Sequence, residues 1–518
     1  MDPNPQSLTE TLASFQSLRR RLENSVVGGA TSVDGRTFSY QAPVGSDVVS
    51  PGGFVTLVDG DRRALGQVLD QVLAVREGPA TGATVDEAGL GGAERLALTT
   101  QVRLRVIEGN GRILLGDGRP FVDAAVEEST AAEVEEFFSQ ANVDATRLPV
   151  GQLALVKDPV VATLDASGFD RHTFLCGQSG SGKTYSLGVV LERLLLDTEL
   201  RIIVLDPNSD FVHLNTPRPG ADPALAAQLA ALTPRIRVRR PSDEGAEDRL
   251  RLRFDELNEA AWGALLRLDP IADGDEYATL REVLDAQQGM AAMAQLEADS
   301  ADESTGKHAR ALLRRMRNLG ADRWDVWARG QAGSLLEELD EDGWRALIID
   351  TGTLGTPQEK ALVAQAVLEH LWVKRNDRRP VLVVIDEAHN VCPQLPDSSL
   401  QAMATEYAIR IAAEGRKFGL YLLISTQRPQ KVHENVVSQC DNLMLMRMNS
   451  VADVASLAGL FSFVPQPLLD QATGFRQGQA LVAGKVVPIP TFVRFGARVS
   501  VEGGSDVATD WATPQAAQ

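Results

Sequence analysis

The sequence is poor in the residue types that build disulfide frameworks and zinc sites. Its 518 residues include three widely separated cysteines (Cys176, Cys392 and Cys440) and six histidines, none paired at metal-ligand spacing. This composition is typical of a reducing compartment and argues against a protein-bound zinc ion. No apolar run approaches the length of a membrane span, and residues 1–21 are too polar for a signal peptide. We therefore expect a cytoplasmic protein without a membrane segment.

Basic residues are also in deficit. Lysine and arginine number 51 against 70 aspartates and glutamates, which gives a formal net charge of −19. A protein that coats DNA with its outer surface should be basic. Any contact with nucleic acid is therefore expected on a local basic lining, such as a channel. The hydrophobic content of 44% is ordinary for a globular protein, and the chain is long enough for several domains.

Changes of pattern divide the chain into four parts. Residues 1–44 are expected to form a helix and a linker, and residues 45–163 show the short alternating strands of a small β-barrel. Residues 164–495 alternate apolar strands with helices, which predicts a parallel sheet covered on both faces. Within that part, residues 217–343 are expected to be a helical insertion. Residues 496–518 are small, polar and acidic, and we expect a disordered tail.

Two local signals refine the first two parts. Near the N-terminus, apolar residues recur at the spacing of one helical face: Leu8, Leu12, Phe15 and Leu22. This face either packs on its own domain or docks a partner, and residues 28–40 after it are expected to be a loop. In the barrel, the Asn110-Gly111 pair between apolar runs predicts a hairpin turn.

Residues 177–184 carry the clearest functional motif. They read G-Q-S-G-S-G-K-T and fit the phosphate-binding P-loop, with an apolar strand before them and a helix after them. Glycines let backbone N–H groups turn towards an anion, and Lys183 would reach the β- and γ-phosphates of ATP. The alternative is a Gly/Ser turn that binds nothing. The residues expected to bind the nucleotide are Gly177, Gln178, Ser179, Gly180, Ser181, Gly182, Lys183, Thr184 and Tyr185.

A pair of carboxylates, Asp386-Glu387, follows the apolar run 381–385. Ligands of open α/β sheets bind at the carboxyl ends of the strands, where this pair would emerge. Asp386 and the Thr184 hydroxyl are expected to hold Mg²⁺, and Glu387 to orient and deprotonate the attacking water. A solvated strand end is the alternative. With the P-loop, the pair predicts an α/β fold with a RecA-like (ASCE) P-loop NTPase core.

Two further residues are candidates for sensing and completing the site. Gln427, at the end of the apolar run 420–425, could report on the γ-phosphate; alternatively Ser425 or Thr426 caps a helix there. Arg416 lies in a basic turn before that run and could act as an arginine finger on a neighbouring subunit. The alternative is a basic loop that pairs with Glu414 or touches DNA.

Several other polar residues are weaker candidates. Asp206 and Asp210 either face the nucleotide or form a strand cap and an Asx-turn. Two basic rows could meet DNA phosphates, although charge rows are usually solvated faces. They are Arg235, Arg237, Arg239 and Arg240 on a short strand, and Lys307, Arg310, Arg314 and Arg317 on one helical face. His389 and Cys176 are interpreted as structural.

The motifs together resemble those of the HerA/FtsK superfamily of DNA-translocating P-loop ATPases, and specifically bacterial HerA-type proteins. The resemblance covers residues 45–495 and rests on G-Q-S-G-S-G-K-T, L-D-P-N-S-D-F, V-I-D-E-A-H-N, E-G-R-K-F-G and S-T-Q-R-P in this order. The β-rich part before the P-loop is similar to the HAS barrel of that family. Where the family often has D-P-H-G-E-Y, this chain has the shorter Asp210 in place of the glutamate.

The resemblance implies a homo-hexameric ring with ATP and Mg²⁺ at subunit interfaces and double-stranded DNA in a central channel. It implies Gln427 as sensor and Arg416 as a finger in trans. It also implies a partner, either a NurA-like nuclease or, as in some bacterial relatives in phage defence, an effector such as a NAD-consuming protein of the Sir2 type. We therefore expect an ATP-driven translocase or helicase. An ATP-gated scaffold that assembles and activates an effector enzyme is the alternative.

Overall fold

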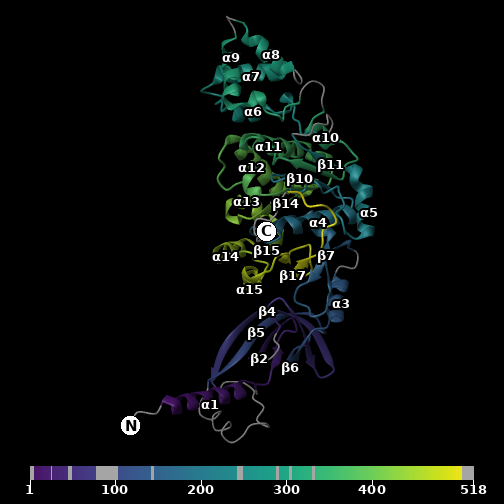
Figure 1. The fold of residues 1–518 in the computed structure, drawn as a ribbon, viewed down its shortest axis with the longest axis vertical. Helices are drawn as coiled ribbons and strands as arrows, with labels where there is room; N and C mark the ends of the chain where they lie inside the picture. The colour runs from purple at the N-terminus through teal and green to yellow at the C-terminus, as the bar shows by residue number, and fades with distance from the viewer. Residues whose placement is uncertain are drawn as a thin grey trace, which may run out of the picture.

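The computed structural model describes residues 5–24, 26–44, 49–77, 103–141, 145–241, 249–286, 291–302, 306–328 and 333–504. The molecule is elongated, with a β-barrel at one end, a helical unit at the other and a large sheet between them (Figure 1). No helix in the described ranges is long and apolar enough to cross a membrane.

The first part of the chain folds into a closed antiparallel barrel in the strand order β1-β2-β5-β4-β3-β6. Helix α1 (Pro5–Asn24) precedes it. The strands are β1 (Gly29–Ser32), β2 (Thr37–Pro43), β3 (Phe54–Asp59), β4 (Arg62–Glu77), β5 (Arg103–Leu115) and β6 (Phe121–Glu128). Residues 28–40, expected to be a loop, therefore supply β1 and much of β2, and the barrel begins earlier than residue 45.

The hairpin turn expected at Asn110-Gly111 is wrong, because both residues lie inside the continuous strand β5. The glycines of this strand leave room for aromatic rings in the barrel core. A Cβ atom on Gly111 would lie 2.3 Å from the Phe38 ring, and one on Gly109 would lie 2.4 Å from the Tyr40 ring. The pair that looks like a turn in the sequence is thus a packing site in a strand.

The last turn of α1 packs on its own barrel. Leu22 is fully buried in a small cluster with Val26, Leu104 and Val106. Beside it, the Arg105 guanidinium donates hydrogen bonds of 2.8 Å to both carboxylate oxygens of Glu23. The side chains of Leu8, Leu12 and Phe15 lie outside the described set, so the docking alternative for the first turns stays a prediction.

The second part is an eleven-stranded sheet in the order β11-β12-β10-β13-β14-β9-β15-β16-β17-β7-β8. Pairing is parallel from β11 to β15 and antiparallel from β15 to β8. The strands are β7 (Arg147–Leu153), β8 (Val161–Asp165), β9 (His172–Cys176), β10 (Arg201–Asp206), β11 (Ile236–Arg239), β12 (Ala346–Asp350), β13 (Val381–Ile385), β14 (Leu420–Thr426), β15 (Cys440–Met446), β16 (Gln479–Ala483) and β17 (Thr491–Phe495). Strands β7 and β8, expected in the barrel, thus extend the central sheet.

Each face of the sheet is covered by its own hydrophobic core, as the uninterrupted apolar strands predict. In β10, Ile203 and Leu205 face one core, which includes residues of α11 (Pro357–Val373) and α12 (Ser399–Glu414). Ile202 and Val204 face the other core, which includes α4 (Lys183–Asp197). The expected α/β fold is confirmed, and Cys176 is a fully buried packing residue.

Most helices of the expected insertion form the far end of the molecule, whereas the first of them, Pro223–Leu232, packs beside α4 at the central sheet (Figure 1). The helices of the insertion are α5 (Pro223–Leu232), α6 (Glu259–Leu266), α7 (Gly274–Ala286), α8 (Ala291–Ser300), α9 (Lys307–Leu319) and α10 (Leu335–Asp340). Trp262 stacks on Trp327 at 5.4 Å in its core. The insertion is not purely helical, because β11 leaves it to join the edge of the sheet.

Short helices and a segment along the sheet complete the chain. Helices α3 (Ala131–Ala141), α13 (Glu434–Val437), α14 (Val451–Leu460) and α15 (Gln466–Asp470) lie outside the insertion. The disordered tail expected from residue 496 begins too early, because residues 496–504 are ordered and Arg498 is 1% exposed. Residues 505–518 lie outside the described part.

Candidate nucleotide site

The candidate site lies at the carboxyl ends of the neighbouring parallel strands β13, β14 and β9. The P-loop follows β9, Asp386-Glu387 follows β13, and Gln427 follows β14. Neighbouring parallel strands present their carboxyl ends on the same side, so Lys183 and Asp386, 203 positions apart in the chain, come together there. The strand order therefore brings these motifs together, as the sequence predicts.

The P-loop backbone adopts conformations that favour glycine. Gly180 has φ +72° and Gly182 has φ +89°, both in the left-handed region. Gly177 leaves no room for a side chain, since a Cβ atom would lie 2.7 Å from Met446. Helix α4 begins at Lys183, directly after the loop, so its unpaired N–H groups and positive dipole end point at the loop. Loop and helix start together form an anion site.

Lys183 is held by the acidic side of the site. Its ammonium lies 2.9 Å from Oδ1 of Asp386 and 3.2 Å from Oε1 of Glu387. It also donates a 3.0 Å hydrogen bond to Oγ of Ser425, which in turn donates a 2.7 Å bond to Asp386. Burial alone would lower the pKa of Lys183, but the two carboxylates outweigh it and raise that pKa. The lysine is therefore charged.

The oxygen atoms of the site fit a hard divalent cation. Oδ2 of Asp386 and Oε2 of Glu387 are buried and form no hydrogen bond with the described residues. Thr184 lines the same cavity of about 1000 Å³ as Lys183 and Glu387. Carboxylate and hydroxyl oxygens are the ligands that Mg²⁺ prefers, together with substrate phosphates. Asp386 itself does not line that cavity, and the joint role of Asp386 and Thr184 as Mg²⁺ ligands stays a prediction.

Glu387 occupies a strained position beside a histidine. Its φ of +44° is in the left-handed region, which is rare for a residue with a side chain. Oε2 of Glu387 lies 3.3 Å from Nδ1 of His389, and that nitrogen lies 3.1 Å from Oγ1 of Thr426. Burial lowers the pKa of His389, while Glu387 opposes the shift. His389, interpreted as structural, connects the candidate base with the end of β14.

Gln427 lies beside the P-loop, and its role as a sensor stays a prediction. It lines the P-loop cavity and also a second cavity that it shares with Gln178 and Ser179. Thr426 accepts a 3.0 Å hydrogen bond from the backbone N–H of Arg428 and so fixes the turn before Pro429. Ser425 does not cap this turn, because it is buried beside Lys183 and Asp386. No local pattern predicts that position of Ser425, because it depends on contacts with residues distant in the chain.

Arg416 lies at the amino ends of the strands, whereas the P-loop lies at their carboxyl ends. It precedes β14, a strand of seven residues, whereas Gln427 follows it. At about 3.3 Å per residue, roughly 20 Å separate the two ends. Arg416 donates a 2.6 Å hydrogen bond to Asp441, which also lies 3.6 Å from Arg171. Arg416 therefore cannot reach the P-loop of its own subunit.

Asp206 forms the strand cap that was one of its two interpretations. Its carboxylate accepts hydrogen bonds from the backbone N–H groups of Asp210 and Phe211, at 3.0 and 2.8 Å. Burial, with a smaller contribution from Asp386, raises the pKa of Asp206 to about 7. The same two causes raise the pKa of Asp210 to about 6. The cap thus places two carboxyl groups of reduced acidity near Asp386.

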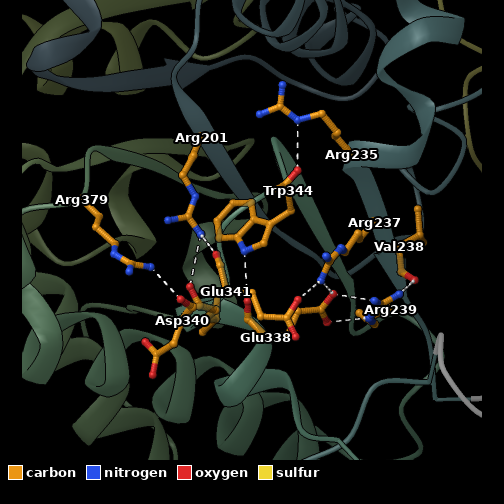
Figure 2. Close-up of polar contacts among 12 residues, drawn as sticks. Arg201, Arg235, Arg237, Val238, Arg239, Glu338, Asp340, Glu341, Trp344 and Arg379 are labelled. Carbon is orange, nitrogen blue, oxygen red and sulfur yellow. Dashed lines mark hydrogen bonds and ion pairs between the residues drawn. The ribbon is translucent and has the colours of Figure 1, made fainter.

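The basic row on β11 is paired within the chain. Figure 2 shows Arg237 and Arg239 converging on Glu338 of α10. Arg237 lies 2.8 Å from Glu338 and 2.6 Å from Glu341, and Arg239 lies 2.6 Å from Glu338. Their charges are neutralised locally, which does not favour DNA contact at this row.

The two remaining arginines of the β11 row also have partners within the chain. Arg235 donates to the carbonyl oxygen of Gly343, and Arg240 lies 3.3 Å from Asp350. On α9, in contrast, Lys307, Arg314 and Arg317 are exposed, while Arg310 donates to two backbone carbonyls. The α9 row remains a prediction as a DNA contact.

Comparison with known proteins confirms the resemblance drawn from the motifs. Residues 148–370 match the family model described as "Helicase HerA, central domain". The chain is 23% identical over 499 residues to the DNA double-strand break repair helicase HerA of Sulfurisphaera tokodaii, covering 93% of this chain and 94% of that protein. It is 24% identical over 417 residues to the protein of the same name from Saccharolobus solfataricus, covering 74% and 75%.

Two solved structures are also similar to this chain. VirB4 of Thermoanaerobacter pseudethanolicus matches with a TM-score of 0.46 and 15% identity, covering 68% of this chain and 97% of that one. The bacterial conjugative coupling protein TrwBdeltaN70 matches with a TM-score of 0.47 and 13% identity, covering 74% and 96%.

Proposed function

We propose that the chain is a Mg²⁺-dependent ATPase that moves along double-stranded DNA. The observation that carries this proposal is the meeting of Lys183, Asp386 and Glu387 directly after the P-loop, where Lys183 and Glu387 line the cavity. A nucleotide-binding loop, a metal-binding carboxylate and a second carboxylate for water activation are the parts that ATP hydrolysis requires. The DNA substrate is inferred from the HerA relatives, whose printed names describe DNA repair helicases.

In this proposal the carboxylates and the lysine exchange partners when the nucleotide binds. Lys183 leaves Asp386 and Glu387 for the β- and γ-phosphates, because phosphate oxygens compete for its charge. Mg²⁺, held by Asp386 and Thr184, would neutralise charge on the phosphates. Glu387, released from Lys183, orients the attacking water and accepts its proton. Gln427 contacts the γ-phosphate and transmits its loss to β14.

We further propose a homo-hexameric ring with DNA in its channel. Support comes from Arg416, which is too far from its own P-loop to act there but is exposed at 41% for a neighbouring subunit. With a net charge of −19, contacts to DNA are expected to be confined to the channel. The ring would work with a partner protein. This partner would be either a nuclease of the NurA type that acts on the DNA or a defence effector such as one of the Sir2 type. A mass measurement in solution with a non-hydrolysable ATP analogue tests the ring.

The central test is ATP hydrolysis with and without duplex DNA. We expect DNA to stimulate hydrolysis, and Glu387→Gln to abolish hydrolysis while ATP binding persists. The exposed Glu434 of α13 supplies the matched control Glu434→Gln, which should hydrolyse at the wild-type rate. A Glu387→Gln protein that hydrolyses ATP at the wild-type rate would show that Glu387 does not activate the attacking water. A ring that binds an effector but shows no response to DNA would favour the scaffold alternative.

A further inference from the structure

The cavity at the P-loop extends well beyond the residues that bind phosphates. Its volume is about 1000 Å³, and its lining also includes Gln152 of β7, Arg494 of β17 and Glu502. The P-loop and the carboxylates account for the triphosphate and its metal. The rest of the cavity is large enough for the nucleoside, and no sequence motif pointed to the residues around it.

The segment that follows β17, residues 496–504, is anchored to the P-loop helix. We call it the C-terminal strap. Glu192 of α4 is 1% exposed and accepts four hydrogen bonds from the strap. The donors are Nε of Arg498 at 3.1 Å, N of Val499 at 2.6 Å, N of Ser500 at 3.0 Å and Oγ of Ser500 at 2.6 Å. A buried carboxylate satisfied in this way fixes its partners in one arrangement.

The helix is also shaped to receive the strap. A Cβ atom on Gly188 would lie 2.5 Å from the Arg498 guanidinium, so only glycine lets that side chain cross α4. Tyr185 accepts a 2.9 Å hydrogen bond from N of Arg498 through its hydroxyl group. Because α4 begins at Lys183, the strap is held in register with the P-loop.

Beyond this anchor the strap is held by two further segments of the chain, at Thr216 and at Asp210. The backbone N–H of Val501 donates to the carbonyl oxygen of Thr216 at 2.9 Å, and that of Gly503 donates to Asp210 at 3.0 Å. These bonds flank Glu502 and present its exposed carboxylate to the cavity. Arg494, opposite Gln152 in the β17–β7 register, presents a guanidinium to the same space.

We propose that Arg494 and Glu502 bind the nucleoside of the nucleotide, the arginine through the base and the glutamate through the ribose hydroxyls. A carboxylate repels phosphates, and vicinal hydroxyls are the donors that it commonly binds on a ribose. A planar guanidinium stacks on the face of a purine or donates to its ring nitrogens. The inference rests on the proposed ATPase function. It names the residues of that site that recognise the nucleoside part of ATP and not its triphosphate.

Calorimetric binding of three probes with Mg²⁺ tests the inference: ATP, 2′-deoxy-ATP and inorganic tripolyphosphate. Wild-type protein should bind ATP about tenfold more tightly than 2′-deoxy-ATP. A tenfold difference in affinity corresponds to about 1.4 kcal/mol, which is typical of the loss of one hydrogen bond. Glu502→Ala should bind both nucleotides equally. Arg494→Ala should weaken both by about tenfold, because stacking on the base does not depend on the 2′-hydroxyl. Neither change should alter the binding of tripolyphosphate.

Exposed residues outside the cavity supply the controls Glu434→Ala and Arg314→Ala, which should retain the wild-type affinities. Unchanged discrimination in Glu502→Ala, or unchanged ATP affinity in Arg494→Ala, would overturn the inference and leave the triphosphate site standing. A wild-type protein that binds neither ATP nor tripolyphosphate would instead overturn the proposed function.

Discussion

Ser425 donates a 2.7 Å hydrogen bond to Asp386 in the buried part of the candidate site. The same hydroxyl group accepts from Lys183, so a single buried oxygen connects the P-loop lysine with the candidate metal ligand. Ser425 lies in β14, one residue before the strand's last residue, Thr426. The orientation of Asp386 therefore depends on the same strand that carries the candidate sensor Gln427.

From this contact we predict that Ser425→Ala weakens the use of Mg²⁺ more than the binding of the nucleotide. Residues that orient a metal ligand typically change metal affinity or activity by 10- to 100-fold, and we expect a loss of about that size. The measurement is the Mg²⁺ concentration at half-maximal ATP hydrolysis. Ser456→Ala, on the exposed side of α14, is the control. An unchanged Mg²⁺ requirement in Ser425→Ala would show that Asp386 is held without it.

A second prediction concerns the arginines of β11. Glu338 is 9% exposed and pairs with both Arg237 and Arg239, so Glu338→Ala would remove the carboxylate that these two partly buried guanidinium groups share. We expect a loss of about 1–3 kcal/mol in the free energy of unfolding, measured by urea denaturation. Arg237→Gln should destabilise the protein in the same way without changing DNA affinity.

DNA binding at several salt concentrations separates this structural role from a phosphate contact. A contact to phosphate steepens the dependence of affinity on salt, and its removal lowers the slope by about one unit per lost charge. Arg314→Gln on the exposed row of α9 is the comparison, because it tests the other basic row by the same measurement. A reduced slope in Arg237→Gln would contradict the assignment of β11 to the fold alone.

A third prediction uses the buried histidine at the start of β9. His172 accepts a 2.9 Å hydrogen bond from the backbone N–H of Leu422. Burial, helped by the charge of Arg416, lowers its pKa from 6.5 to about 4, against a smaller opposing effect of Asp441. The unfolded chain takes up a proton near pH 6.5 and the folded chain does not. Stability is therefore lost as the pH falls from 6.5 towards 4.

The loss amounts to on the order of 3 kcal/mol across this window, since each pKa unit corresponds to about 1.4 kcal/mol. His172→Asn keeps an acceptor for Leu422 and removes the titration, so its free energy of unfolding should vary less with pH. His213→Asn changes an exposed histidine and is the control. A His172→Asn protein with the wild-type pH dependence would refute the attribution.

The sequence was most informative where chemistry demands particular residues at a fixed spacing. The P-loop and Asp386-Glu387 could be assigned because few other patterns place glycines, a lysine and two carboxylates after apolar strands. It failed where the deciding partner is distant. Arg498 looked like part of a disordered tail, although it pairs with Glu192, 306 positions earlier. Asn110-Gly111 looked like a turn, because nothing local shows the rings of Phe38 and Tyr40 that fill the space beside these glycines.

The position of Arg416 leads to the last prediction, which separates action in cis from action in trans. Alone, Arg416→Ala and Lys183→Ala proteins should both lack ATP hydrolysis. Mixed in equal amounts before assembly, they should recover activity, because an Arg416→Ala subunit with an intact P-loop will sometimes adjoin a Lys183→Ala subunit with an intact arginine. Random assembly into a closed ring makes about a quarter of the interfaces complete.

The control is the double variant Lys183→Ala/Arg416→Ala mixed with Arg416→Ala, where no interface can be complete. If the arginine acted within its own subunit, neither mixture would recover, since no subunit in either would hold both residues. Recovery in the first mixture alone therefore requires the arginine to come from a neighbour. The roughly 20 Å between Arg416 and the P-loop edge of its own sheet gives the physical reason to expect that result.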